Sequence, residues 1–235
     1  MDAKQDIPAK TASIVGPPPT ASQSGNNTAR AEIAVPPSWA ADDEALTTAL
    51  TRLVNRVYSE AERGIYSTDF ERTSAEDIAD LLRAGELAVA YLPRRGANGS
   101  AANSNTDDIG GPKPAFHETH GTPIGCISMK QVSPTAGEFG MLAVDPPRRG
   151  GGVGRDLVVF AEERCRQHLG LRAMRLELLA PVHFEHAGKT RLQDWYERLG
   201  YVRVELRDFE QAYPRLFELL SGPTEFRVFE KKFVD

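Results

Sequence analysis

The sequence predicts an α/β domain, on the basis of two periodicities and the order in which they occur. Several stretches repeat apolar side chains every three to four residues, the spacing of a helix with one buried face. Others are short runs rich in β-branched and aromatic residues and bounded by turn residues, which is typical of strands. In chain order they give a strand, two helices, three antiparallel strands, a helix, a strand, a helix and two closing strands.

The first half of this order begins with a short edge strand within residues 31–37, which a pair of prolines ends because proline cannot donate a ladder hydrogen bond. A helix is predicted over 41–62, with acidic residues at its positive end and leucine and valine at helical spacing. A second helix is predicted over 73–85, with Thr73 and Glu76 at the spacing of a capping box.

The second half continues with strands at 86–93, 124–132 and 137–144. The stretch at about 94–123 consists mostly of loop formers and is interpreted as a flexible insertion between the first two of these strands. The remaining elements are a helix at 154–170, a strand at 173–182, a helix at 188–200, and strands at 201–206 and 225–233.

Composition sets the broad class. A chain of 235 residues can form one domain with a sizeable core, and we expect one domain over 31–235 after a disordered tail at 1–30. A net charge of −5 argues against a nucleic-acid surface. No apolar run is long enough for a membrane span, and no secretory signal is evident, so we expect a cytoplasmic protein, with the nucleus as a further compartment.

The two cysteines support this assignment. Cys126 falls in a predicted strand and Cys165 in a predicted helix. We expect two buried thiols rather than a disulfide, which fits a reducing compartment.

The stretch "AVDPPRRGGGVGRDL", residues 143–157, joins a predicted strand to a predicted helix. The first amides of a helix lack intrahelical partners, so a bare glycine turn in this place favours an anion, above all a phosphate. Arg148, Arg149 and Arg155 add positive charge. The P-loop pattern fails because no Lys-Ser or Lys-Thr follows the glycines, and the dinucleotide pattern fails because Arg155 takes its closing position.

The pattern that fits is R-x-x-G-x-G, formed by Arg149, Gly152 and Gly154 after "LAVDP". A second motif, "DWYERLGYVRV" at Asp194–Val204, contains Y-x-x-L-G-Y on a predicted helix that leads into a strand. Together with the order of elements, the two motifs resemble the GNAT superfamily of N-acetyltransferases over about residues 31–235. This resemblance implies a mixed, mostly antiparallel central sheet of about six to seven strands, flanked by helices on both faces.

The resemblance implies an N-acetyltransferase that uses acetyl-CoA as cosubstrate and no metal, with direct attack of an amine on the thioester. The expected acceptor is the primary amine of a small molecule, and the expected assembly is a monomer or homodimer. Two alternatives stay open, namely acetylation of a peptide N-terminus or lysine, and a non-catalytic module that senses acyl-CoA. A nucleotide-binding protein is disfavoured by the missing Lys-Ser.

The resemblance also assigns the cofactor contacts. It implies that the turn holds the CoA diphosphate through Arg149, Gly150, Gly151, Gly152, Val153, Gly154 and Arg155. It implies that the strand before the turn bulges and splays from the next strand, so that Leu142, Ala143 and Val144 pair with the pantetheine arm. The N–H of Leu142 is then the expected oxyanion donor, and Tyr196 the expected acid that faces the departing sulfur.

Two further positions are less defined. Glu138 is the expected general base; on a regular strand Glu138, Gly140 and Leu142 share a face, although a bulge would change that parity. A solvated glutamate, with a water chain as base, is the alternative. Lys189 stands where the family commonly has an asparagine that contacts pantetheine; it could reach a phosphate instead or be a solvated residue at the helix start.

The histidines do not predict a metal site. His117 and His120, and separately His183 and His186, have suitable spacing but no convincing third ligand, so we expect surface histidines. His183 and Glu185 are expected near the acceptor entrance. The acid-rich run at 58–77 could attract a cationic amine, or could be a solvated face.

Overall fold

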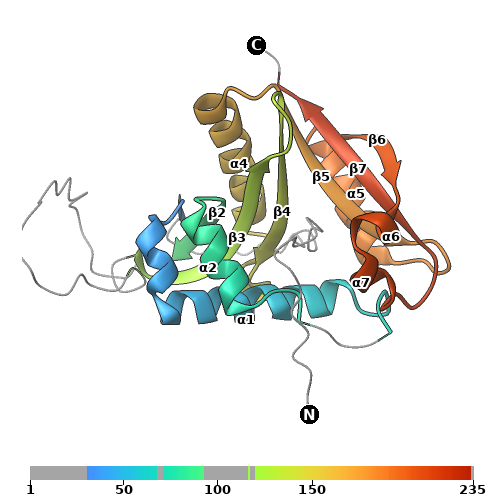
Figure 1. The fold of residues 1–235 in the computed structure, drawn as a ribbon, viewed down its shortest axis with the longest axis horizontal. Coiled ribbons are helices and arrows are strands. Elements are labelled where there is room, and N and C mark those ends of the chain that lie inside the picture. Colours follow the sequence, from blue (N-terminus) through green and yellow to red (C-terminus); the bar gives the residue numbers. More distant parts are fainter. Residues whose placement is uncertain (1–30, 68–70, 93–115, 117–119, 234–235) are drawn as a thin grey trace, which may run out of the picture.

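A computed structural model describes residues 31–67, 71–92, 116 and 120–233. They form a seven-stranded sheet in the order β1-β2-β3-β4-β5-β7-β6, with helices on both faces (Figure 1). Neighbouring strands are antiparallel except β4 and β5, which are parallel. The predicted fold class and element order are confirmed. The expected tail at 1–30 and most of the insertion at 94–123 lie outside the described residues.

The element bounds agree with the predicted ranges to within a few residues. The strands are β1 (Glu32–Ala34), β2 (Leu87–Leu92), β3 (Thr122–Gln131), β4 (Ala136–Val144), β5 (Ala173–Pro181), β6 (Val202–Arg207) and β7 (Thr224–Lys232). The helices are α1 (Glu44–Ala61), α2 (Ala75–Arg83), α4 (Val153–Leu169), α5 (Ala187–Arg198), α6 (Phe209–Ala212) and α7 (Pro214–Phe217), with short 3-10 helices η1 (Ser38–Asp42) and η2 (Pro146–Arg148).

The sheet has a hydrophobic core on each face. Helices α1 and α2 cover one face with residues such as Leu50 and Ile78, and α6 and α7 extend this cover through Phe209 and Leu216. Helices α4 and α5 cover the other face, where residues such as Leu157 are buried. The sequence did not predict α6 or α7, because each is only one turn long and lacks a helical repeat.

Helix α2 begins at a capping box that lies one residue later than predicted. Ser74 Oγ accepts from the Asp77 N–H at 3.1 Å, and Asp77 Oδ2 accepts from the Ser74 N–H at 2.8 Å. The prediction of Thr73 and Glu76 was therefore wrong. The reason is a tertiary contact: Thr73 exchanges two backbone hydrogen bonds with the Asn55 side chain on α1, which keeps it outside the helix.

Strand β4 carries a bulge near its carboxyl end. Cys126 lies opposite Ala143 and Ser128 opposite Gly140, so β4 has one residue more than β3 in this interval. Met141 takes a positive φ of 45° there. As a result Met141 joins the core under α1, whereas Leu142 packs toward α4 and α5. The regular-strand expectation that Glu138 and Leu142 share a face does not hold, because the bulge shifts the parity.

Strands β4 and β5 also separate from each other. They pair only from Ala136 to Glu138 on β4 and from Ala173 to Arg175 on β5. Beyond these residues β5 continues to pair with β7, while the rest of β4 diverges toward the glycine turn. The carboxyl ends of β4 and β5 therefore do not pair with each other, and we call this break in the pairing the opening. It lies where the resemblance implies that pantetheine inserts.

Two further expectations concern single features. Cys126 and Cys165 are both free and buried, as predicted, and burial raises the pKa of the Cys126 thiol to about 12 and that of the Cys165 thiol to about 11. Among the helices of the described residues, none is long and apolar enough to cross a membrane.

Gly137 provides a test of core packing at the start of β4. A Cβ at this position would lie 2.9 Å from Cys165 Sγ and 3.3 Å from Leu171 Cδ1. We expect Gly137→Ala to lower the free energy of unfolding by about 1–3 kcal/mol through overpacking, measured by urea denaturation. Gly151→Ala is the control, since its Cβ would meet only Arg148 O at 3.5 Å. An equal loss of stability in both variants would contradict this account.

Candidate active site

The glycine turn presents a row of open amides in front of α4. Gly150 and Gly152 have φ values of 84° and 87°, which favour glycine, and Gly152 is the N-cap of the helix. The first helical bond runs from the Asp156 N–H to the Gly152 carbonyl at 3.0 Å. Within the described part of the chain, the amides from Gly150 to Arg155 donate to no backbone carbonyl. Among the described residues, no atom lies within 4 Å of the position that a Cβ on Gly152 would take.

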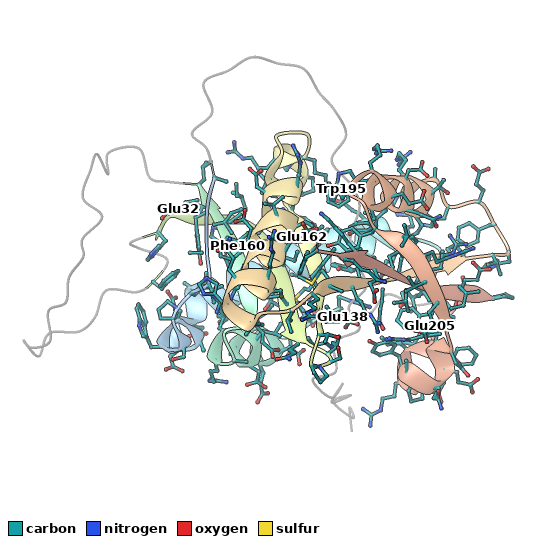
Figure 2. All side chains as sticks on the ribbon, turned by 90° about the horizontal axis from the view of Figure 1, so that it is seen from above. Glu32, Glu138, Phe160, Glu162, Trp195 and Glu205 are labelled. Carbon is teal, nitrogen blue, oxygen red and sulfur yellow. The ribbon has the colours of Figure 1, made fainter. Side chains whose placement is uncertain are left out.

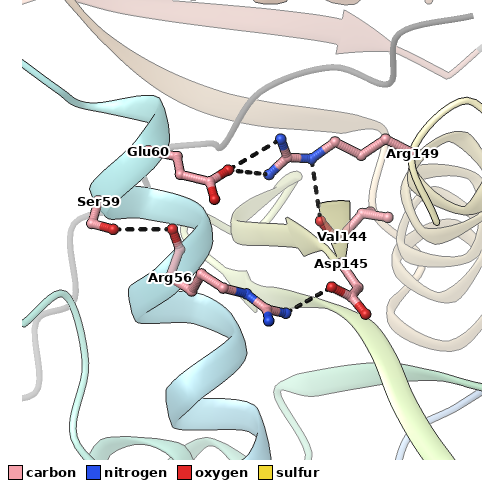
Figure 3. A network of polar contacts seen from close by, with 6 residues as sticks. All are labelled: Arg56, Ser59, Glu60, Val144, Asp145 and Arg149. Carbon is pink, nitrogen blue, oxygen red and sulfur yellow. Dashed lines mark hydrogen bonds and ion pairs between the residues drawn. The ribbon is translucent and has the colours of Figure 1, made fainter. Parts of the chain in front are cut away.

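Arg149 lies beside this turn but is already paired (Figure 3). Its Nε donates to the Val144 carbonyl at 3.4 Å, and its guanidinium contacts Glu60 Oε2 on α1, also at 3.4 Å. The sequence predicted Arg149 only as a cation for the anion site. A phosphate would therefore share Arg149 with Glu60 or displace Glu60. Arg148 and Arg155 have no ion pair among the described residues and are the more available cations.

Helix α1 spans the opening between β4 and β5 (Figures 1 and 3). On the β4 side, Arg56 contacts Asp145 at 2.7 Å, next to the Glu60–Arg149 pair. On the β5 side, Glu62, just past the end of α1, contacts Lys189 at the start of α5 at 3.2 Å. The carboxyl half of α1 thus contacts the end of β4 on one side and the start of α5 on the other.

Tyr196, which the resemblance assigns as the acid, lies on α5 in the core of the sheet face that α4 and α5 cover. Its side chain is fully buried and packs on Phe139 of β4, with ring centroids 5.9 Å apart. Its hydroxyl has no hydrogen-bond partner among the described residues, which is costly for a buried group. Burial, and then the nearby Tyr58 of α1, raise its pKa well above the ordinary value, so the hydroxyl keeps its proton. An unsatisfied donor beside the opening fits a ligand sulfur or oxygen.

Glu138 is buried on β4 rather than solvated. Its side chain is only 5% exposed, and its Oε1 lies 3.4 Å from Lys130 Nζ on β3. Figure 2 shows Glu138 and Glu205 on the same side of the sheet, the side opposite Trp195 of α5. Glu138 therefore lies on the α1 face, whereas the side chain of Leu142 lies on the other.

The sequence reasoning missed Glu177, a second buried carboxylate close to Glu138. Glu177 lies on β5, two residues after the last residue that pairs with β4. Its Oε1 accepts from Arg207 of β6, and its Oε2 accepts from the Tyr213 hydroxyl at 3.2 Å. Burial, and then the charge of Glu138, raise its pKa to about 7. A lone glutamate in the apolar run "LELLA" was the available signal, since an unpaired buried charge is rarely tolerated.

Lys189 is neither solvated nor placed at the turn. It is 3% exposed, and its Nζ donates to Glu62 Oε1 at 3.2 Å. Arg72 approaches the other oxygen of Glu62, with Nη1 at 3.9 Å, and also lies over the Tyr58 ring at 5.0 Å. Burial lowers the pKa of Lys189, and Glu62 opposes this change. The alternative of a solvated residue at the helix start is wrong, because the start of α5 packs against the end of α1.

The histidines have local structural contacts. His186 caps α5 by accepting from the Lys189 N–H at 3.2 Å, and His183 Nδ1 lies 3.1 Å from the Pro223 carbonyl. The rings of His120 and Phe116 stack with their centroids 3.9 Å apart. His117 lies outside the described residues. Among the residues that the structure describes, no group of three or more His, Cys, Asp or Glu side chains is arranged to hold a metal.

The site thus combines parallel strands that separate, a bulge in β4 and a turn with open amides in front of α4. Residues 115–203 match the family model of the acetyltransferase (GNAT) domain. This segment includes the bulged strand β4, the turn and α5. Over these residues the chain is therefore similar to the GNAT domain, as the two motifs predicted. A search of curated proteins finds no match.

Several solved structures share the fold. An aminoglycoside 6'-N-acetyltransferase complexed with coenzyme A is 16% identical, with a TM-score of 0.52 and coverage of 83% of this chain and 94% of that chain. The NatC complex bound to Gag peptide and CoA is 15% identical, with a TM-score of 0.52 and coverage of 87% and 99%. An acetyltransferase from Streptococcus agalactiae is 14% identical, with a TM-score of 0.52 and coverage of 86% and 98%.

Proposed function

We propose that the chain is an acetyl-CoA-dependent N-acetyltransferase whose residues 31–235 act as one domain. The observation that carries the proposal is the separation of β4 from β5, together with the open amides of the turn and the buried Tyr196 hydroxyl that has no partner among the described residues. An extended ligand with a diphosphate at one end and a thioester at the other matches both features. Two structures with this fold contain CoA by their own description.

The turn and β4 would hold the cosubstrate. The amides from Gly150 to Arg155 would donate to the diphosphate, with Arg148 and Arg155 as cations. The diverging edge of β4, Leu142 to Val144, has no strand partner on the β5 side in the part of the chain that the structure describes, and it would pair with the amides of the arm. Acetyl-CoA supplies an activated acyl group when bound. The Leu142 N–H would donate to the thioester carbonyl oxygen as negative charge develops there.

Glu177 is the better candidate for the base, in place of Glu138. A base works best when its pKa lies near the operating pH, and Glu177 has a raised pKa while its carboxylate lies beside the opening. It would take the proton from the acceptor ammonium and release the amine for attack. Tyr196 would donate its proton to the departing sulfur. Glu138 would contribute mainly by raising the pKa of Glu177.

A small acceptor, or the end of a chain, fits better than a lysine within an extended peptide. The loop after α1 is tied to the loop before β7 by backbone bonds from Ser67 to Leu219 at 2.8 Å and from Ser221 to Ile65 at 2.9 Å. Tyr66 in this bridge is close enough to Tyr213, the hydrogen-bond partner of Glu177, to interact with it electrostatically. The bridge would therefore obstruct a polypeptide that passes straight through. We therefore propose a small-molecule amine, with a peptide N-terminus as the second candidate.

The test combines calorimetric titration of CoA with thiol release from acetyl-CoA over a panel of amines and short peptides. We expect CoA to bind and at least one small primary amine to be acetylated. Binding without turnover on any acceptor would favour a sensor of acyl-CoA. Turnover only with peptides that carry an internal lysine would contradict the proposed acceptor class.

A further inference from the structure

The carboxylate of Glu177 accepts hydrogen bonds from the side of β5 that lies away from β4. Its Oε1 accepts from Arg207, the last residue of β6, and its Oε2 accepts from the Tyr213 hydroxyl at 3.2 Å. Tyr213 belongs to the connection between β6 and β7, and in the sheet order β4-β5-β7-β6 both donors therefore lie beyond β5 as seen from β4. On the β4 side, Glu138 is close enough to raise the pKa of Glu177. The two donors thus hold the carboxylate from the side away from the opening.

The ring of Tyr213 is fixed by two other aromatic rings. Tyr213 stands between the one-turn helices α6 and α7, which lie beside β6 and β7 (Figure 1). Its ring centroid is 5.4 Å from that of Phe209 on α6 and 5.6 Å from that of Phe226 on β7. Phe209 and Phe226 are buried, and their centroids are 5.2 Å apart. Because packed aromatic rings prefer few relative orientations, these contacts fix the direction in which the Tyr213 hydroxyl points.

The two donors differ in how firmly they can hold Glu177. The side chain of Arg207 is 32% exposed, and its Nε also lies 3.5 Å from Glu205 Oε2. Water and Glu205 therefore compete with Glu177 for this guanidinium. Burial, and then the charge of Glu177, raise the pKa of the Tyr213 hydroxyl, so that it keeps its proton and remains a donor. Tyr213 is thus the more constrained of the two partners.

We propose that Tyr213 is a positioning residue, whose hydroxyl holds the Glu177 carboxylate in the direction from which it takes the proton of the acceptor ammonium. This inference rests on the proposed role of Glu177 as the base. In that step an O–H bond forms on Glu177, the N–H bond of the ammonium breaks, and its electron pair stays on the amine. Tyr213 keeps its own proton. Position matters because a base acts only within hydrogen-bond reach of the proton that it takes.

The same hydrogen bond makes the contact measurable, since it lowers the pKa of Glu177 while burial and Glu138 raise it. Removing the Tyr213 hydroxyl should therefore raise the pKa of Glu177. The charged and titratable groups that act on this pair are Glu138 of β4, Lys130 of β3 and Arg207 of β6 at Glu177, and Glu138, Arg72 and Tyr66 at Tyr213.

The first experiment uses Tyr213→Phe, which keeps the packed ring and removes only the hydroxyl. With the best acceptor, the rise of kcat/KM should move to higher pH by about one pH unit. At pH values above the rise, kcat should still be about tenfold lower, because Arg207 alone holds the carboxylate. The affinity for CoA should stay unchanged. A role in setting the pKa alone would leave this high-pH kcat equal or higher, since a stronger base transfers the proton more readily, and that result would overturn the positioning role.

Tyr201→Phe is the matched control. The Tyr201 hydroxyl donates to Glu162 Oε1 at 2.8 Å, and Lys231 Nζ donates to the same carboxylate, so a tyrosine and a cation again share one glutamate. Tyr201 belongs to the core on the other face of the sheet. This variant should lose a similar amount of stability in urea denaturation but keep the kcat and the pH profile of the unmodified enzyme. An equal loss of kcat in both variants would overturn the inference.

A second measurement needs no turnover. The ¹³C resonance of the Glu177 carboxyl group should titrate near pH 7 in the unmodified protein and about one pH unit higher in Tyr213→Phe. The same titration in both proteins, in an enzyme that acetylates an amine, would overturn the positioning role alone. If no amine of any kind is acetylated, the proposed function fails and the positioning role fails with it.

Discussion

Glu177→Gln should lower kcat for acetyl transfer by about 10²–10⁴-fold, because it removes the group that accepts the proton of the acceptor. The affinity for CoA should change little, since Glu177 lies on β5 on the α1 face and away from the turn. The measurement is steady-state kinetics with the best acceptor, alongside calorimetric titration of CoA.

The pH dependence provides a readout that a structural role would not give. In the unmodified enzyme kcat/KM should rise as the pH passes through about 7, where Glu177 loses its proton. The Glu177→Gln variant should lack this rise of kcat/KM with pH. The free energy of unfolding should show the opposite trend. The pKa of Glu177 is higher in the folded state than in the unfolded state, so the native state binds more protons between about pH 4.5 and 7. The contribution of Glu177 to stability therefore falls as the pH rises through this window.

Two controls accompany this variant. Glu205→Gln removes a carboxylate that is half-exposed and lies 3.5 Å from the same Arg207, and it should leave kcat within about twofold. Glu138→Gln should have a smaller effect on kcat. It should move the rise of kcat/KM to lower pH, because Glu138 raises the pKa of Glu177. A larger loss in Glu138→Gln than in Glu177→Gln would return the role of base to Glu138.

Tyr196→Phe should lower kcat by about 10²-fold with little change in CoA affinity, because it removes only the proton that the departing sulfur needs. The variant should fold normally. Its hydroxyl is buried without a partner, so its removal should leave the free energy of unfolding unchanged or raise it by about 1 kcal/mol. The measurements are kinetics, CoA titration and urea denaturation.

Tyr91→Phe is a matched control for this variant. Tyr91 on β2 also has a fully buried hydroxyl without a hydrogen-bond partner among the described residues, but it lies away from the opening between β4 and β5. It should show a similar effect on stability and no effect on kcat. Unchanged turnover in Tyr196→Phe, or an equal loss in both variants, would remove Tyr196 from the role of acid.

Most of the fold could be predicted from the sequence, because most of its helices and strands depend on local residue patterns. Apolar side chains at helical spacing located α1, α4 and α5, and the bare glycines after β4 located the turn. Ser74 was missed because its role as N-cap depends on the contact between Thr73 and Asn55, which are far apart in the sequence. The faces to which the side chains of β4 point could not be predicted for the same reason, because the bulge at Met141 is defined by the pairing of β4 with β3.

The candidate site was only half predictable for the same reason. Tyr196 and the turn belong to continuous motifs. Glu177 is a single residue in a strand, and its role depends on its contacts with Arg207 and Tyr213, which only the structure shows. Lys189 shows the limit most clearly. Its sequence position indicates only the start of a helix, and its partner Glu62 is 127 residues away.

The central claim is that the amides in front of α4 hold the diphosphate of CoA. The most direct measurement is the backbone amide spectrum of the ¹⁵N-labelled protein during titration with CoA, assigned at Gly150 to Arg155. We predict large downfield proton shifts for these amides, as new hydrogen bonds to phosphate would produce. Saturable CoA binding that leaves these amide signals in place, or no binding at all, would contradict the claim.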